Sequence, residues 1–238
     1  MNGRFMGLLS GFCAVVLFLL FITGNRQGVI SADNGTVKKE TPVIVIDAGH
    51  GGEDGGASSA DGLCEKDVNL RLCRMLQAYF TANGWRVIMT RTDDRLLYNR
   101  NVNFKGRKKV LDLAARYAIG EKSNPTLFLS VHMNAYPALP SCSGMQVWYS
   151  PNHPESAHYA ASLQASASKI QPDNHRKIKA AGSSIYLLHH LEIPAVLVEA
   201  GFLSNPAEAA LLRKETYLSS LAFSIFCGVV ETQASAAP

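Results

Sequence analysis

The sequence predicts an α/β protein with one main domain built on a mostly parallel sheet. Two observations support this fold class. Apolar runs at residues 43–46, 126–131 and 195–198 lack the polar alternation of a half-exposed sheet, which is typical of strands buried on both faces. Helical patterns separate these runs, and a strand, a helix and a second strand in succession imply a right-handed parallel crossover.

The first strand, at residues 43–46, leads directly into Asp47 and His50. Five glycines follow within residues 49–56. Glycine allows positive φ and close approach of the backbone to other groups. We therefore expect a rigid strand that ends in a loop carrying His50, at the sheet edge where open α/β sheets bind their ligands.

A helix is predicted at residues 65–83, because apolar side chains recur there at three- and four-residue steps and an Asn-Gly pair follows. Residues 85–90 form the next short apolar strand. A second helix is expected at 106–119, with Val110 on its apolar side together with Leu113, Ala114 and Tyr117. An Asn-Pro pair then breaks the chain before the strand at 126–131, which ends at His132.

The second half of the domain is predicted to alternate in the same way. Residues 144–150 are expected to form a strand, and residues 154–170 a helix that begins near a proline, as the first turn of a helix tolerates. Residues 184–190 read as a short strand or edge segment, and a proline leads into the buried strand that ends at Glu199.

The chain is predicted to close with two helices. Asn205 and Pro206 are typical of a helix start, so a short helix follows them. The last helix, at residues 214–231, carries an apolar stripe made of Leu218, Leu221, Ile225 and Val229.

The domain organisation predicted from composition has four parts. Residues 1–26 form an N-terminal membrane anchor or signal segment, because residues 5–23 are uncharged and apolar over about the length of a bilayer span. We expect an uncleaved anchor, with a cleaved signal peptide as the alternative, and the domain is exported in either case. Residues 27–41 are a linker, residues 42–232 the catalytic domain, and residues 233–238 a flexible tail.

Composition excludes some classes of protein. A hydrophobic content of 47% and a charged content of 18% are those of a folded domain, and a net charge of +4 gives no case for nucleic-acid binding. The five cysteines show no zinc-finger spacing. Cys64 adjoins Glu65 and was weighed as a metal ligand, but we expect it and Cys73, Cys142 and Cys227 to be free or loosely paired thiols.

Three predicted strands each end at a side chain that could bind a metal or move a proton: His50, His132 and Glu199. Glu65 opens the helix after the first strand. If the strands are parallel, these four groups meet at one edge of the sheet. Two imidazoles and one carboxylate are the protein ligands of a catalytic zinc, and a further carboxylate beside the metal's water suits hydrolysis. The residues alone therefore predict a zinc hydrolase of an exported polymer or peptide.

Three separated motifs carry a resemblance to a known family. Ile46-Asp-Ala-Gly-His50-Gly-Gly with Glu65-Lys-Asp, then Ser130-Val-His132-Met-Asn134-Ala, then Val198-Glu199-Ala-Gly-Phe-Leu-Ser-Asn205-Pro resemble the zinc-dependent N-acetylmuramoyl-L-alanine amidases of bacterial cell walls (amidase type 3). The similarity covers residues 42 to about 230 in matching order. It implies a twisted mixed sheet with helices on both faces.

The resemblance also implies the roles of the site residues. His50, Glu65 and His132 would bind one Zn²⁺, and Glu199 would be the catalytic carboxylate. The reaction is hydrolysis of the amide between N-acetylmuramic acid and the L-alanine of the peptidoglycan stem peptide. From its position two residues past a ligand, Asn134 is a candidate to donate to the substrate, with a structural bond in its loop as the alternative. Two further acids, Asp54 and Asp67, are candidates to orient the metal ligands, with surface or capping roles as the alternative.

Within that family the chain is most similar to the germination-specific, spore-cortex amidases, whose product is a precursor of muramic-δ-lactam. Only about one helix fits between Ser150 and Ala195, so we expect no helix that blocks the zinc. The predicted partners are peptidoglycan strands, the membrane through the N-terminal segment, and an activating protein. His189 and His190 keep a small chance of lining the pocket.

Two alternatives stay open from the sequence. The first is a zinc peptidase that cuts within the stem peptide. The second is a wall-binding module without enzymatic activity, although the presence of all four chemical groups argues against it.

Overall fold

The structure is a computed structural model that describes residues 41–98, 101 and 106–235. The predicted anchor or signal segment and nearly all of the predicted linker lie outside these residues. Within the described ranges, none of the helices combines the length and the apolar character that crossing a bilayer requires.

A sheet of six strands forms the centre of the described domain, in the order β2-β1-β3-β6-β4-β5. The first four strands in this order, β2, β1, β3 and β6, are parallel neighbours. Strand β4 runs antiparallel to β6, and β5 runs parallel to β4. The predicted mixed, mostly parallel sheet is therefore confirmed. The strands are β1 (Val43–Ala48), β2 (Arg86–Met89), β3 (Leu127–Asn134), β4 (Gln146–Tyr149), β5 (Lys179–Ala180) and β6 (Ala195–Phe202).

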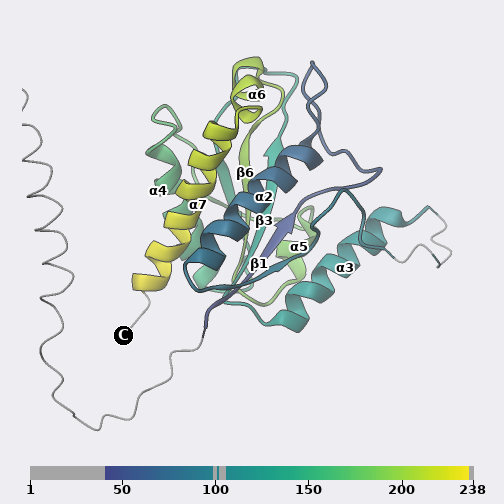
Figure 1. Cartoon of the computed structure of the whole chain (residues 1–238), viewed down its shortest axis with the longest axis vertical. Helices are drawn as coiled ribbons and strands as arrows, with labels where there is room; N and C mark the ends of the chain where they lie inside the picture. Colours follow the sequence, from purple (N-terminus) through teal and green to yellow (C-terminus); the bar gives the residue numbers. More distant parts are fainter. Residues whose placement is uncertain (1–40, 99–100, 102–105, 236–238) are drawn as a thin grey trace, which may run out of the picture. The chain divides into compact units, whose positions relative to one another are not determined.

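Helices cover both faces of the sheet, as predicted (Figure 1). Ile44 and Ile46 of β1 are buried in the larger apolar cluster, against helices α2, α4 and α7, whereas Val45 is buried in the smaller cluster on the opposite face, with α3 and α5. This alternation is the two-residue period of a strand buried on both sides. The helices are α2 (Glu65–Ala82), α3 (Lys108–Ser123), α4 (Glu155–Ser168), α5 (Tyr186–His190), α6 (Pro206–Leu212) and α7 (Glu215–Ser235).

The structure corrects several sequence predictions. The sequence predicts a short strand or edge segment at 184–190, but Tyr186–His190 is the short helix α5, which buries both Leu187 and Leu188. Val110 was expected on the apolar side of its helix, yet it is 61% exposed, because the buried side of α3 carries the polar Asp112 and Arg116 instead. Helix α7 continues to Ser235, four residues beyond its predicted end.

Candidate active site

The parallel order of β1, β3 and β6 brings their carboxyl ends to one edge of the sheet, as the sequence predicted. His132 of β3 lies directly opposite Glu199 of β6 in the strand register. The loop after β1 stays beside β3, because Gly49 N–H donates to the Val131 carbonyl over 3.0 Å. A Cβ atom on Gly49 would overlap the imidazole of His132, so this close approach requires glycine.

His50, Glu65 and His132 form a compact group at this edge. One carboxylate oxygen of Glu65, Oε1, lies 3.2 Å from Nε2 of His50 and 2.9 Å from Nδ1 of His132. One nitrogen or oxygen atom from each of the three side chains lies within 4.8 Å of the others, which is close enough to hold a single metal ion. The geometry thus unites the three predicted ligands, and Cys64 is not part of the group.

Glu65 is buried and fully engaged by its surroundings. Its Oε2 accepts a hydrogen bond from the backbone N–H of Ala57 at 2.8 Å, and its Oε1 accepts one from Met133 at 3.1 Å. Burial would raise its pKa, but hydrogen bonds and charge from His132 and His50 outweigh burial and hold the pKa of Glu65 well below its usual range. Glu65 is therefore ionised at every physiological pH, as a metal ligand must be.

His50 occupies an unusual backbone conformation, with φ at 59° in the left-handed region. Its Nδ1 lies at the ion-pair distance of 3.0 Å from Oδ2 of Asp54 but without hydrogen-bond geometry, so the orienting role of that acid stays a prediction. Burial lowers the pKa of His50, but Glu65 and Asp54 together raise it above its usual value.

Glu199 has the opposite surroundings. Its side chain is half-buried at the cavity wall, and its enclosed Oε2 has no hydrogen-bond partner among the described residues. Burial raises the pKa of Glu199 to about 7, against the opposing effect of His132. A carboxyl group with a pKa near the working pH can both accept and return a proton.

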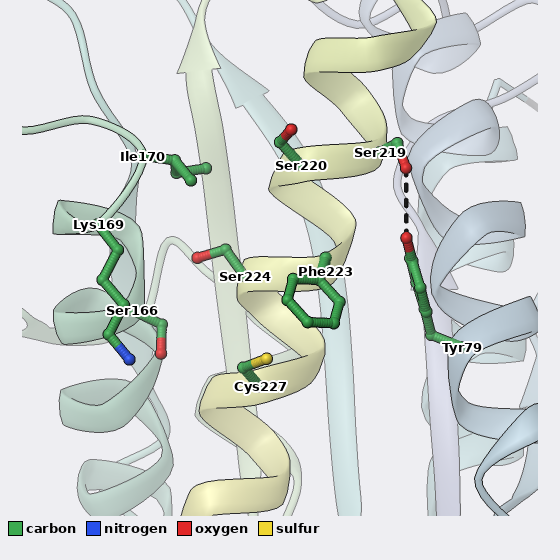
Figure 2. Close-up of a pocket in the computed structure, with 9 residues that line it drawn as sticks. All are labelled: Tyr79, Ser166, Lys169, Ile170, Ser219, Ser220, Phe223, Ser224 and Cys227. Atoms are coloured by element: carbon green, nitrogen blue, oxygen red, sulfur yellow. Dashed lines mark hydrogen bonds between the residues drawn. The ribbon is translucent and has the colours of Figure 1, made fainter. Parts of the chain in front are cut away.

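A cavity of about 230 Å³ adjoins these groups. His50, His132 and Glu199 line it together with the segment around the start of α5 and three charged residues of α3, Lys109, Asp112 and Arg116. A larger cavity of about 450 Å³ lies elsewhere, between α4 and α7 with Tyr79 of α2 (Figure 2). Because its lining holds no histidine and no carboxylate, that larger cavity does not suit metal-assisted hydrolysis.

Some predicted residues lie away from this chemistry. Asn134 does not line the active-site cavity, and its carbonyl accepts a structural hydrogen bond from Leu203 at 2.8 Å. Asp67 is exposed on the first turn of α2. His189 and His190 are exposed at the end of α5 and do not line the cavity. The cysteines of the described chain, Cys64, Cys73, Cys142 and Cys227, are free.

The sequence interpretation missed a buried polar network behind the group of His50, Glu65 and His132. Arg91 and Arg116 are 1% and 2% exposed, and Arg116 forms ion pairs with Asp47 and Asp112. The four-residue spacing of Asp112 and Arg116 within one helix could have indicated an ion pair. Nothing in the sequence marks the bonds of either arginine to the backbone.

Comparison with known proteins gives the family. The model of the N-acetylmuramoyl-L-alanine amidase family matches residues 44–231, which is most of the chain. The chain belongs to this family. Its predicted enzyme class, a hydrolase of the N-acetylmuramoyl-L-alanine amide, is thereby confirmed.

Individual relatives of this amidase support its membership in the family. It is 37% identical over 188 residues to the germination-specific N-acetylmuramoyl-L-alanine amidase of Bacillus subtilis (strain 168), covering 79% of this chain and 78% of the relative. The solved CwlD amidase from Clostridioides difficile, in complex with the GerS lipoprotein, is 35% identical with a TM-score of 0.77, covering 82% of this chain and 100% of that one. An N-acetylmuramoyl-L-alanine amidase from Clostridium difficile 630 is 26% identical with a TM-score of 0.71, covering 83% of this chain and 99% of that one.

Proposed function

We propose that this amidase is a zinc enzyme that releases the stem peptide from muramic acid in spore-cortex peptidoglycan. The observation that carries the proposal is the group of His50, Glu65 and His132 beside the unpartnered carboxylate of Glu199 on one sheet edge.

The three grouped side chains suit one Zn²⁺. Two imidazole nitrogens and one ionised carboxylate form a donor set that leaves a fourth tetrahedral position open. When bound, zinc would polarise the scissile carbonyl and make a water molecule more acidic. Asp54, in contact with the other nitrogen of His50, would hold that ring in the orientation that frees Nε2 for the metal.

Glu199 supplies the proton transfers. In its ionised form it accepts a proton from the attacking water, and in its protonated form it gives that proton to the leaving amine of L-alanine. Without metal the pKa of Glu199 is about 7, so both forms are accessible near neutral pH in the metal-free protein. The cavity beside Glu199 is the place for the reacting amide.

The spore-cortex assignment is supported by similarity and by architecture. A relative that is 37% identical is named as germination-specific. Between β4 and β6 the described chain holds only the helix α4, the two-residue strand β5 and the five-residue helix α5. This connection is too short for a long helix that would block the cavity, so control of activity would come from a protein partner or from the timing of expression. The relative in complex with a lipoprotein is consistent with such a partner.

Residues 1–26 would export the domain and anchor it at the outer face of the cytoplasmic membrane, with residues 27–41 as a linker to the catalytic domain at 42–232. This placement follows from the uncharged run at residues 5–23. It would hold the active site against the cell wall or the spore cortex.

Product identification tests the proposal. Purified protein is loaded with zinc and incubated with cortex and vegetative peptidoglycan, and the products are identified by mass spectrometry. We expect intact stem peptides that begin at L-alanine, glycan strands that carry peptide-free muramic acid, and loss of both on chelation with recovery on added zinc. Fragments cut within the stem would instead support a zinc peptidase, and wall binding without cleavage would support a non-enzymatic module.

A further inference from the structure

Two buried arginines lie under the loop that carries the first metal ligand. We propose that Arg91 and Arg116 are positioning residues, which fix His50 and Glu65 in the geometry that binds the metal before the metal arrives. This inference rests on the proposed zinc site, and it assigns a role to two side chains that do not touch the metal-binding atoms.

The loop after β1 departs from the regular backbone geometry of the sheet. The strand ends at Ala48, His50 adopts a φ of 59°, and Gly51 adopts a φ of 141°. The carbonyl groups of Ala48, Gly49 and His50 all lie against buried arginine side chains, and Ala48 and Gly49 are enclosed by protein. Enclosed carbonyl groups need hydrogen-bond donors, and a loop with positive φ at a non-glycine residue persists only where its surroundings enforce it.

Arg116 supplies two of these donors. From α3 its Nη1 donates to the Ala48 carbonyl at 2.7 Å, and its Nη2 donates to the His50 carbonyl at 2.8 Å. The guanidinium is held in turn by Asp47, 2.6 Å from Nη1, and by Asp112, 2.7 Å from Nε. The backbone of the ligand residue itself is thus bonded to a side chain that two carboxylates keep in one orientation.

Arg91 connects the loop to the second ligand. Its Nε donates to the Ala48 carbonyl at 2.9 Å, while its Nη2 lies 3.0 Å from the Gly49 carbonyl and 2.8 Å from the Lys66 carbonyl. Lys66 directly follows Glu65 in the first turn of α2. One guanidinium therefore joins the backbone next to His50 to the backbone next to Glu65, and so sets the spacing between the two ligands.

These bonds require arginine. A guanidinium presents several N–H donors in a rigid plane, so it can bond two or three carbonyl groups at fixed separations. A lysine ammonium keeps the positive charge but cannot span the same acceptors in a fixed geometry. Gly49 has a second donor in Asn69, whose Nδ2 lies 3.1 Å from its carbonyl, so we expect the link to Lys66 to be the more sensitive part of the Arg91 contacts.

Arginine-to-lysine variants test this role through metal affinity. We compare Arg91→Lys and Arg116→Lys with wild type, and measure the zinc dissociation constant by competition with a chromogenic chelator. We expect zinc to bind about 10- to 100-fold more weakly to each variant, as is usual when a partner that orients a metal ligand is lost. The matched control is Arg74→Lys, because Arg74 donates to the Thr92 carbonyl outside the ligand loop, and its zinc affinity should stay at the wild-type value.

Amide hydrogen exchange on the wild-type protein gives a second test that needs no variant to fold. If the arginines hold the loop, the amides of residues 49–52 are protected from exchange in the metal-free protein, and zinc adds little protection. Rapid exchange of these amides that slows only when zinc is added would show that the metal orders the loop, which would overturn the inference.

The outcomes separate this inference from the proposed function. A wild-type protein that binds no zinc would overturn the proposed metal site and this inference with it. Folded lysine variants that bind zinc as tightly as a zinc-binding wild type would overturn the positioning role alone. Weaker binding in both variants with an unchanged Arg74→Lys control would support it.

Discussion

Two carboxylates on opposite sides of the active site, Glu65 and Glu199, have different surroundings and opposite pKa shifts. On the β1–α2 side, Glu65 accepts hydrogen bonds from two backbone N–H groups and contacts two imidazoles. On the β6 side, Glu199 is half-buried beside the cavity, and its enclosed Oε2 has no hydrogen-bond partner among the described residues. The pKa of Glu65 lies well below its usual range, whereas the pKa of Glu199 is raised to about 7.

The difference shows how one sheet edge assigns two roles to one residue type. A carboxylate whose oxygens are occupied by donors stays ionised and in place, which suits a metal ligand. A carboxylate without donors carries the full cost of burying its charge, so it exchanges its proton near neutral pH, which suits a general base. The first predictions below each change one of these two carboxylates, and the last changes a residue away from both.

The largest effect is expected on the β6 side. Glu199→Gln removes the group that moves the proton while it keeps the size of the side chain, so amidase activity should fall by about 1,000-fold. Zinc affinity should be retained, because the ligand group lies on the other side. Release of stem peptides at a near wild-type rate would contradict the role of Glu199, and zinc content by metal analysis is the control.

The corresponding substitution of Glu65, on the β1–α2 side, should lower zinc affinity, which Glu199→Gln should leave unchanged. Glu65→Gln replaces an ionised ligand by a neutral amide, so zinc affinity should fall by more than about 100-fold, the upper figure for loss of a group that merely orients a ligand. The measurement is chelator competition. If this variant bound zinc normally and lost only activity, the two carboxylates would have to exchange roles.

The pH dependence of stability sharpens the contrast in the metal-free protein. Burial raises the pKa of Glu199 from 4.5 to about 7, so its favourable contribution is fully present below about pH 4.5 and is lost as pH rises through 7. Glu199→Gln removes this loss, and we expect it to raise the free energy of unfolding at about pH 8 by roughly 2 to 3 kcal/mol. Urea unfolding with chelator present measures this change.

The same experiment at about pH 4 provides the control, because Glu199 is then protonated in both the folded and the unfolded state. The variant should differ little from wild type there. An equal gain at both pH values would mean that packing, and not burial of charge, accounts for the effect.

The smallest effect is expected at a residue away from both carboxylates. Asn205 begins α6, where its side-chain oxygen accepts hydrogen bonds from the backbone N–H groups of Ala207 and Glu208. Asn205→Ala should lower the free energy of unfolding by about 1 kcal/mol, as loss of a helix cap usually does. Zinc affinity should not change, and a large change would show that this region also supports the site.

The sequence predicts the parts of the site that follow from strand order. His50, His132 and Glu199 could be placed together because the sequence predicts each at the carboxyl end of a buried strand, and parallel neighbouring strands end at the same edge. In the structure β3 and β6 continue beyond His132 and Glu199, to Asn134 and Phe202, but the two residues remain opposite each other. Glu65 could be added because the glycine loop returns the chain to the sheet at the start of α2. These inferences need only the period and the direction of each element.

The remaining parts depend on contacts between distant residues. Arg116 bonds to backbone carbonyls 66 and 68 residues away, and a carbonyl is present in every residue, so the sequence contains no signal for such a partner. Helix α5 has five residues, which is too short to show a helical period, and the burial of Leu187 and Leu188 by the rest of the fold decides its conformation. The exposure of Val110 follows from the buried ion pair of Arg116 with Asp112 on the same helix.

Gly49 has a practical consequence for anyone who engineers this enzyme. The imidazole of His132 occupies the space where a side chain would begin, so even alanine at this position would displace His132, a proposed metal ligand. In a library with all twenty amino acids at position 49, screened for cell-wall lysis, we expect glycine to be the residue recovered. The close approach of the loop after β1 to His132 thus depends on the hydrogen atom that glycine has in place of a side chain.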